Sequence, residues 1–210
     1  MARQQLGDSK LITFLLYVSV MLVITYLQQE FALLPELQNL DIVSEDTKVE
    51  ILERWQRIRW LSFLLVPILL VLRISLVTLC LFIGGFFFTE MAGRKFKDWW
   101  GVATIAQAVM LTYSIILCIV NLAFGSNMAT EVTNYTSLLF LGGEKIEPWV
   151  RMPLAAVNVF ELLYWIVMAL CVGKLCGTKF DRSFRFVMSS YGVGYLFYVA
   201  LLMFLLLYLS

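Results

Sequence analysis

The chain has 210 residues, of which 61% are hydrophobic and only 15% are charged, and its mean hydropathy is +0.84. A soluble domain carries about 25% charged and 45–50% apolar residues, so this composition excludes an ordinary soluble domain and favours an integral membrane protein. The net charge of +1 excludes the overall positive field with which many proteins attract nucleic acid.

The sequence also lacks the residues on which many enzymes and metal sites depend. It contains no histidine, which is the commonest general base and a common zinc ligand. The spacing of Cys171 and Cys176 is not that of a metal-binding or thioredoxin-type motif. There is no nucleophile elbow, phosphate-binding loop or paired intramembrane acid. We therefore expect a protein that is not an enzyme and has no metal site and no cofactor.

Five mostly apolar segments are predicted to cross the membrane as helices, because a hydrocarbon core of about 30 Å requires about 20 residues at 1.5 Å each. They are residues 11–27, 60–88, 101–124, 154–173 and 186–209. None alternates apolar and polar residues as a barrel strand does. The predicted fold is an all-α membrane bundle of five helices in which residues 1–210 form a single membrane domain.

The loop between the first two segments is predicted to contain a helix of its own, at residues 44–58. Ser44 supplies a capping hydroxyl, and acidic residues follow at the positive end of the helix dipole. This helix either lies on the outer membrane surface or projects as a stalk towards a partner. Four apolar side chains on or beside one face form its candidate membrane- or partner-binding surface: Ile51, Leu52, Trp55 and Ile58.

The second segment is longer than one upright span and shorter than two, and it contains Pro67. One helix kinked near Pro67 and two half-spans both fit its length. The loops after the second and fourth segments are rich in Lys and Arg, which predicts that both lie in the cytoplasm. Five spans, with the N-terminus inside and the C-terminus outside, place both of these basic loops in the cytoplasm. Two half-spans would place the first of these basic loops outside, so we favour one helix.

Arg73 and Glu161 are the candidate functional residues, because ionisable side chains within spans are costly and mark sites in membrane proteins. They lie at similar depth if the second span proper starts near Pro67, so we predict that they pair. The pair either fixes helix packing or forms a polar site open to a small molecule, a proton or a partner; alternatively, Arg73 extends to water. Three amides add hydrogen-bonding groups that usually hold helices together: Gln107, Asn121 and Asn158.

Two further patterns concern the surface. Tryptophan prefers the membrane interface, and five tryptophans near predicted span ends are interpreted as anchors there: Trp55, Trp60, Trp99, Trp100 and Trp149. The triplet that begins at Asn134 is a glycosylation acceptor pattern in the third loop, which is predicted to lie outside.

Two stretches, Leu81–Gly101 and Asn158–Val187, resemble the Yip family of small five-span membrane proteins, the Yip/Yif and prenylated-Rab-interacting group with their bacterial relatives. In the first stretch a span ends in a short loop with Gly, Lys and Phe before the next span. In the second, Asn and Phe open a span, a Trp follows, and a basic loop leads to the last span. The resemblance implies a five-helix bundle with a cytosolic N-terminus. For eukaryotic members it implies a role in vesicle traffic with Rab GTPases.

We expect a non-enzymatic scaffold or accessory subunit of a membrane transport or secretion assembly. The alternatives are a small transporter or channel with its polar site at Arg73 and Glu161, and a membrane-traffic factor by the Yip resemblance. The expected partners are the lipid bilayer and other membrane proteins or further copies of the chain, and not nucleic acid. The expected location is a bacterial inner membrane, with a eukaryotic ER or Golgi membrane as the alternative.

Overall fold

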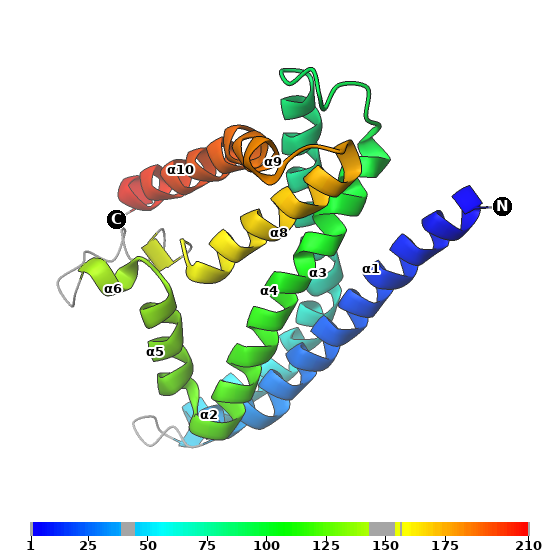
Figure 1. Ribbon diagram of the computed structural model, residues 1–210. Coiled ribbons are helices and arrows are strands. Elements are labelled where there is room, and N and C mark those ends of the chain that lie inside the picture. The colour runs from blue at the N-terminus through cyan, green and yellow to red at the C-terminus, as the bar shows by residue number, and fades with distance from the viewer. Residues whose placement is uncertain (1, 39–44, 143–153, 156, 210) are drawn as a thin grey trace. The chain divides into compact units, whose positions relative to one another are not determined.

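The computed structural model describes the chain apart from residues 1, 39–44, 143–153, 156 and 210 (Figure 1). In the described part nearly all regular structure is helical, and the one strand-like contact is an isolated bridge between Ser137 and Asn158. Five helical segments in that part are long and apolar enough to cross a membrane: Leu11–Leu33, Thr47–Gly85, Phe96–Phe124, Val159–Cys176 and Phe180–Tyr208. The predicted all-α class with five candidate spans is therefore confirmed.

Most described residues lie in helices, whose backbone groups bond within the helix as a lipid environment requires. In chain order they are α1 (Ala2–Leu27), the π-helix η1 (Gln28–Leu33), α2 (Leu34–Gln38), α3 (Glu45–Gly85), α4 (Phe96–Phe124), α5 (Ser126–Thr136), α6 (Leu139–Gly142), α8 (Val159–Cys176), α9 (Phe180–Val187), the π-helix η2 (Met188–Gly192) and α10 (Val193–Leu209). Their contacts define two compact units. The first comprises Met1–Leu72 and Leu111–Thr130, and the second comprises Arg73–Met110 and Glu131–Ser210.

In the first unit, polar contacts join η1 to the N-terminal part of α3. The guanidinium of Arg59 forms an ion pair with Glu30 (Nη1 to Oε1, 2.7 Å). The backbone carbonyl of Arg59 accepts a hydrogen bond from the side-chain amide of Gln29 (3.4 Å). The same guanidinium lies 5.3 Å from the centroid of the Trp55 ring. Trp55 is only 8% exposed, whereas Ile58 is 62% exposed. The predicted apolar face of Ile51, Leu52, Trp55 and Ile58 is thus not one free surface, because its largest side chain is covered within the unit.

Helix α3 is unbroken over 41 residues and contains Pro67 within it. The predicted outer helix and the second span are therefore one helix about 60 Å long, and the alternative of two half-spans is wrong. The proposed cap, Ser44, lies outside the described residues. The predicted outer helix is the N-terminal part of this helix, and its position, on the membrane surface or as a stalk, stays a prediction. A kink at Pro67 stays a prediction.

The core of the second unit is built from helical stripes of buried side chains. On α3 the stripe is Ile74, Thr78 and Leu81, and on α8 it is Tyr164, Met168 and Val172, with all six side chains at most 2% exposed. These spacings of three or four residues keep each stripe on one helix face. Helix α8 ends at Cys176, and the next residue, Gly177, has a φ of +70° that turns the chain back so that α9 packs against α8 (Figure 1).

Close contact between α3 and η2 depends on a glycine. A Cβ atom added at Gly84 would lie 2.3 Å from the Cβ of Ser190, far inside van der Waals contact. Small residues at such positions allow helix backbones in a membrane to approach closely. Gly84 is therefore a packing residue at the centre of this contact.

The fourth span begins later than predicted. Residue 154 was the expected start, but α8 begins at Val159, and Asn158 has an extended backbone with φ −127° and ψ 168°. The side-chain oxygen of Asn158 accepts a hydrogen bond from the backbone N–H of Glu161 at 2.9 Å. Asn158 is thus the N-cap of α8. The prediction that Asn158 lies inside the fourth span is therefore wrong.

Two of the predicted interface tryptophans lie in the core. Trp55 belongs to the first unit, and Trp99 is 1% exposed in the second unit, where its ring packs 5.3 Å from that of Phe186. Trp60 is 61% exposed, its role as an interface anchor stays a prediction, and Trp149 lies outside the described residues. Asn134 lies within helix α5 rather than in an open loop.

Candidate functional site

Arg73 and Glu161, which are 88 positions apart in the sequence, are in contact within the second unit. The distance between Arg73 Nη2 and Glu161 Oε2 is 3.1 Å. Helix α3 provides the arginine, and the first turn of α8 provides the glutamate. The pairing predicted from the cost of lone charges in lipid is therefore present.

The carboxylate of Glu161 is fully engaged inside the unit. Its Oε2 accepts from Arg73, and its Oε1 accepts from the indole N–H of Trp165 (3.1 Å) and from the hydroxyl of Tyr191 (2.7 Å). The Glu161 side chain is 3% exposed. Donors from α3, α8 and η2 thus converge on one carboxylate, which is the condition under which a buried charge is tolerated.

The local structure of α8 supports the same charge. Glu161 lies in the first turn of the helix, three residues after the N-cap Asn158. The N-terminus of a helix carries a partial positive charge, and a carboxylate there is stabilised by about 0.3–1 kcal/mol at exposed sites and more where it is partly buried. The start of α8 at Val159 therefore places its acidic residue where the helix itself favours it.

Four aromatic side chains surround the ion pair, and we call them the aromatic cluster: Tyr164, Trp165, Tyr191 and Tyr195. The guanidinium of Arg73 lies 5.4 Å from the centroid of the Tyr164 ring, within the range of a cation–π interaction. The rings of Trp165 and Tyr191 meet edge to face at 6.1 Å, and those of Trp165 and Tyr195 at 5.8 Å. These rings help to enclose the Glu161 side of the ion pair, which is 3% exposed, and electrostatic attraction is stronger where water is excluded.

The arginine is less enclosed than the glutamate. The side chain of Arg73 is 35% exposed, and Glu161 is its one hydrogen-bonding partner among the described residues. A guanidinium has five N–H donors. The hydroxyl of Tyr164 is buried and also has no partner among the described residues. The hydrogen-bonding capacity that remains at this site therefore belongs to Arg73 and Tyr164.

The other predicted polar residues do not join this site. Gln107 lies in the second unit, where its buried Oε1 has no partner among the described residues and no described contact links it to the pair. Asn121 lies in the first unit, and its buried Oδ1 is likewise unpartnered in the described part of the chain. Asn158 caps α8 through its hydrogen bond with the backbone N–H of Glu161.

Sequence reasoning missed the aromatic cluster. Trp165 follows Glu161 by four positions, a spacing that brings side chains together on a helix. This contact could therefore have been predicted from the sequence. Tyr191 is 30 positions from Glu161 and lies in a π-helix, and no local pattern predicts that contact.

The described residues contain no group of three side chains suited to hold a metal ion. No protein-family model matches the sequence, and no curated protein and no solved structure was found to be similar to it.

Proposed function

We propose that the chain is a non-enzymatic scaffold or accessory subunit of a membrane assembly, and that it binds a partner membrane protein through the N-terminal part of α3. The observation that carries this proposal is the continuity of α3 from Glu45 to Gly85. If Trp60 marks the membrane interface, residues 45–59 extend about 22 Å beyond it at 1.5 Å per residue. We call residues 45–59 the α3 extension.

The α3 extension has the properties of a rigid docking element. Exposed ion pairs at i,i+4 spacing, Glu50–Arg54 (2.6 Å) and Glu53–Arg57 (3.5 Å), favour its helical state. Arg59 ties its base to Glu30 of η1. The face away from Trp55 is exposed and carries Val49, Glu53 and Gln56, which together offer apolar, charged and amide groups to a partner.

A photo-crosslinking amino acid at Gln56 should capture one defined membrane protein or a second copy of this chain, because this position lies on the exposed face. The same amino acid at Leu69, which is 57% exposed within the span of the same helix, should capture chiefly lipid. Crosslinked products are compared by mass spectrometry after labelling in the native membrane. Lipid products alone at both positions would contradict a docking role.

The transporter alternative is supported by one observation, the exposure of Arg73, and is opposed by the engagement of Glu161. A carboxylate that already accepts from three donors has little capacity left for a solute. The two functions are separated by reconstitution of the purified chain into liposomes. A scaffold carries no flux that depends on Arg73, whereas a transporter loses its flux when Arg73 is replaced.

A membrane-traffic role rests on the resemblance of Leu81–Gly101 and Asn158–Val187 to the Yip family.

We further propose the N-in, C-out orientation, with a bacterial inner membrane as the location. The two basic loops are predicted to share the cytoplasmic side, and an ion pair between Glu90 of one and Arg182 of the other supports this. In a variant whose four native cysteines are replaced by alanine, a cysteine at Lys95 should react with an impermeant maleimide only after the membrane is opened. A cysteine at Gln56 should react in intact cells. The reverse pattern would contradict the orientation.

A further inference from the structure

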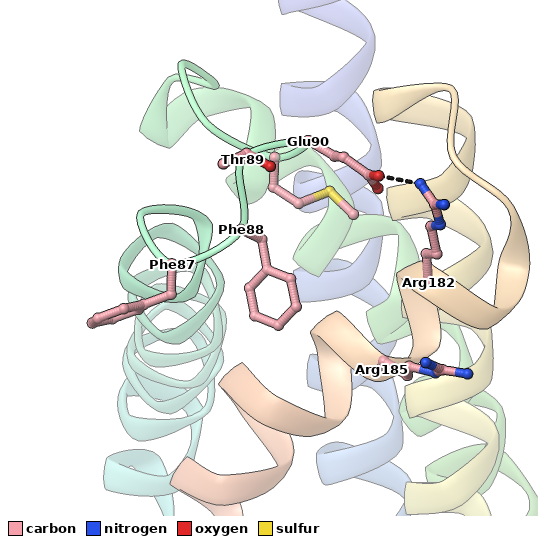
Figure 2. A pocket seen from close by; sticks show the side chains of 7 residues that line it. Phe87, Phe88, Thr89, Glu90, Arg182 and Arg185 are labelled. Atoms are coloured by element: carbon pink, nitrogen blue, oxygen red, sulfur yellow. Dashed lines mark hydrogen bonds and ion pairs between the residues drawn. The ribbon is translucent and has the colours of Figure 1, made fainter.

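A cavity of about 320 Å³ lies where the turn after α3 meets α9, within the second unit (Figure 2). Residues 87–91 line it from the turn, and Arg182 and Arg185 line it from α9. Figure 2 shows Glu90 reaching across to Arg182, so an ion pair closes one side of the cavity. The ring of Phe88, which lines the apolar side of the cavity, packs edge to face on the ring of Phe186, with 5.3 Å between the ring centroids.

Both arginines can bind a further anion. Their side chains are 64% and 74% exposed, and each is paired with one carboxylate: Arg182 with Glu90, and Arg185 with Asp181 at 3.0 Å. A guanidinium has five N–H donors in a planar fork that matches phosphate oxygens. One acidic partner therefore leaves donors of each arginine available at the cavity.

The cavity lies beside the ends of candidate spans, in a region with an excess of positive charge. Three candidate spans end or begin beside it, at Gly85, Cys176 and Phe180. Residues 86–98 and 174–185 together contain seven Lys and Arg but only three Asp and Glu. Basic pockets at the ends of spanning helices attract anionic lipid headgroups. Phe87, which lines the cavity, and its chain neighbour Phe86 are 80% and 70% exposed and provide an apolar surface.

We propose that this cavity binds the phosphate of an anionic phospholipid through Arg182 and Arg185, with the acyl chains of the lipid along Phe86 and Phe87. The combination of arginines with exposed aromatic rings favours a lipid over free phosphate, because a soluble anion gains nothing from the apolar surface. Glu90 competes with the lipid for Arg182 and thereby limits the affinity.

The test is a titration of the purified full chain in detergent with phosphatidylglycerol, with bound lipid counted by native mass spectrometry. Phosphatidylglycerol should bind more tightly than phosphatidylcholine, and millimolar inorganic phosphate should not displace it. Arg185→Gln should weaken binding about fivefold, the equivalent of about 1 kcal/mol per basic residue at an anionic surface. Glu90→Gln should strengthen binding, because it removes the competing carboxylate.

The matched control is Lys97→Gln, which removes an exposed positive charge from the same basic region but does not line the cavity. Its effect should be smaller at about 0.15 M salt, where exposed charges are screened. Arg185→Gln should keep the fold, since its partner Asp181 is an exposed neighbour on the same helix. Equal losses for Arg185→Gln and Lys97→Gln, unchanged binding by Glu90→Gln, or displacement by inorganic phosphate would each overturn the proposal.

Discussion

Replacement of Arg73 by leucine should destabilise the protein by about 3 kcal/mol, because it leaves the carboxylate of Glu161 buried without its cation. Removal of one partner of a buried pair typically costs about 3–5 kcal/mol, and the 35% exposure of Arg73 argues for the lower end of that range. The measurement is the free energy of unfolding in mixed detergent micelles, followed by tryptophan fluorescence. Glu161→Leu should also destabilise, since Trp165 and Tyr191 then lose their acceptor.

The double replacement of Arg73 and Glu161 by leucine should recover much of the loss, because no unpaired charge then remains. The control is Arg54→Leu on the same helix, whose pair with Glu50 is exposed. It should change stability by no more than about 0.5 kcal/mol, since exposed ion pairs contribute little. If the two single losses simply add in the double variant, the residues are not coupled.

Gly84→Ala should destabilise the protein by about 1–3 kcal/mol, the usual cost of forcing extra volume into a packed core. The new methyl group would overlap Ser190, whose Cβ lies on the backbone of η2 and cannot rotate away. The same unfolding measurement in mixed micelles tests this expectation.

The neighbouring glycine provides the control. A Cβ at Gly85 would lie 3.4 Å from the ring of Trp99, which is ordinary contact. Gly85→Ala should therefore change stability by no more than about 0.5 kcal/mol. Equal stability of the two variants would show that α3 and η2 do not approach as closely as described.

The five candidate spans and the ion pair could be predicted from the sequence because both follow from the properties of the lipid bilayer. Apolar runs of sufficient length must become helices in lipid, and two charges in such runs are costly until they meet. The start of α8 was missed because Leu154 and the next two residues extend the apolar run, so hydropathy hid the capping signal of Asn158.

Burial within the bundle was harder to predict. Trp99 sits near a span end, where tryptophan is ordinarily an anchor, yet it is 1% exposed because α9 brings Phe186 against it. Trp55 is covered within the first unit, where Arg59 stacks on its ring. Both outcomes depend on contacts between distant segments, which hydrophobic pattern alone does not specify.

The separation between Arg73 and Glu161 has a consequence for biosynthesis. Arg73 leaves the ribosome 88 residues before its counter-charge exists, which at about 5–20 residues per second is a delay of roughly 4–18 s. During that interval a lone arginine in lipid costs about 2.5–3.5 kcal/mol. We therefore expect Arg73 to lie beside water or protein until α8 is made, when Glu161 supplies its counter-charge.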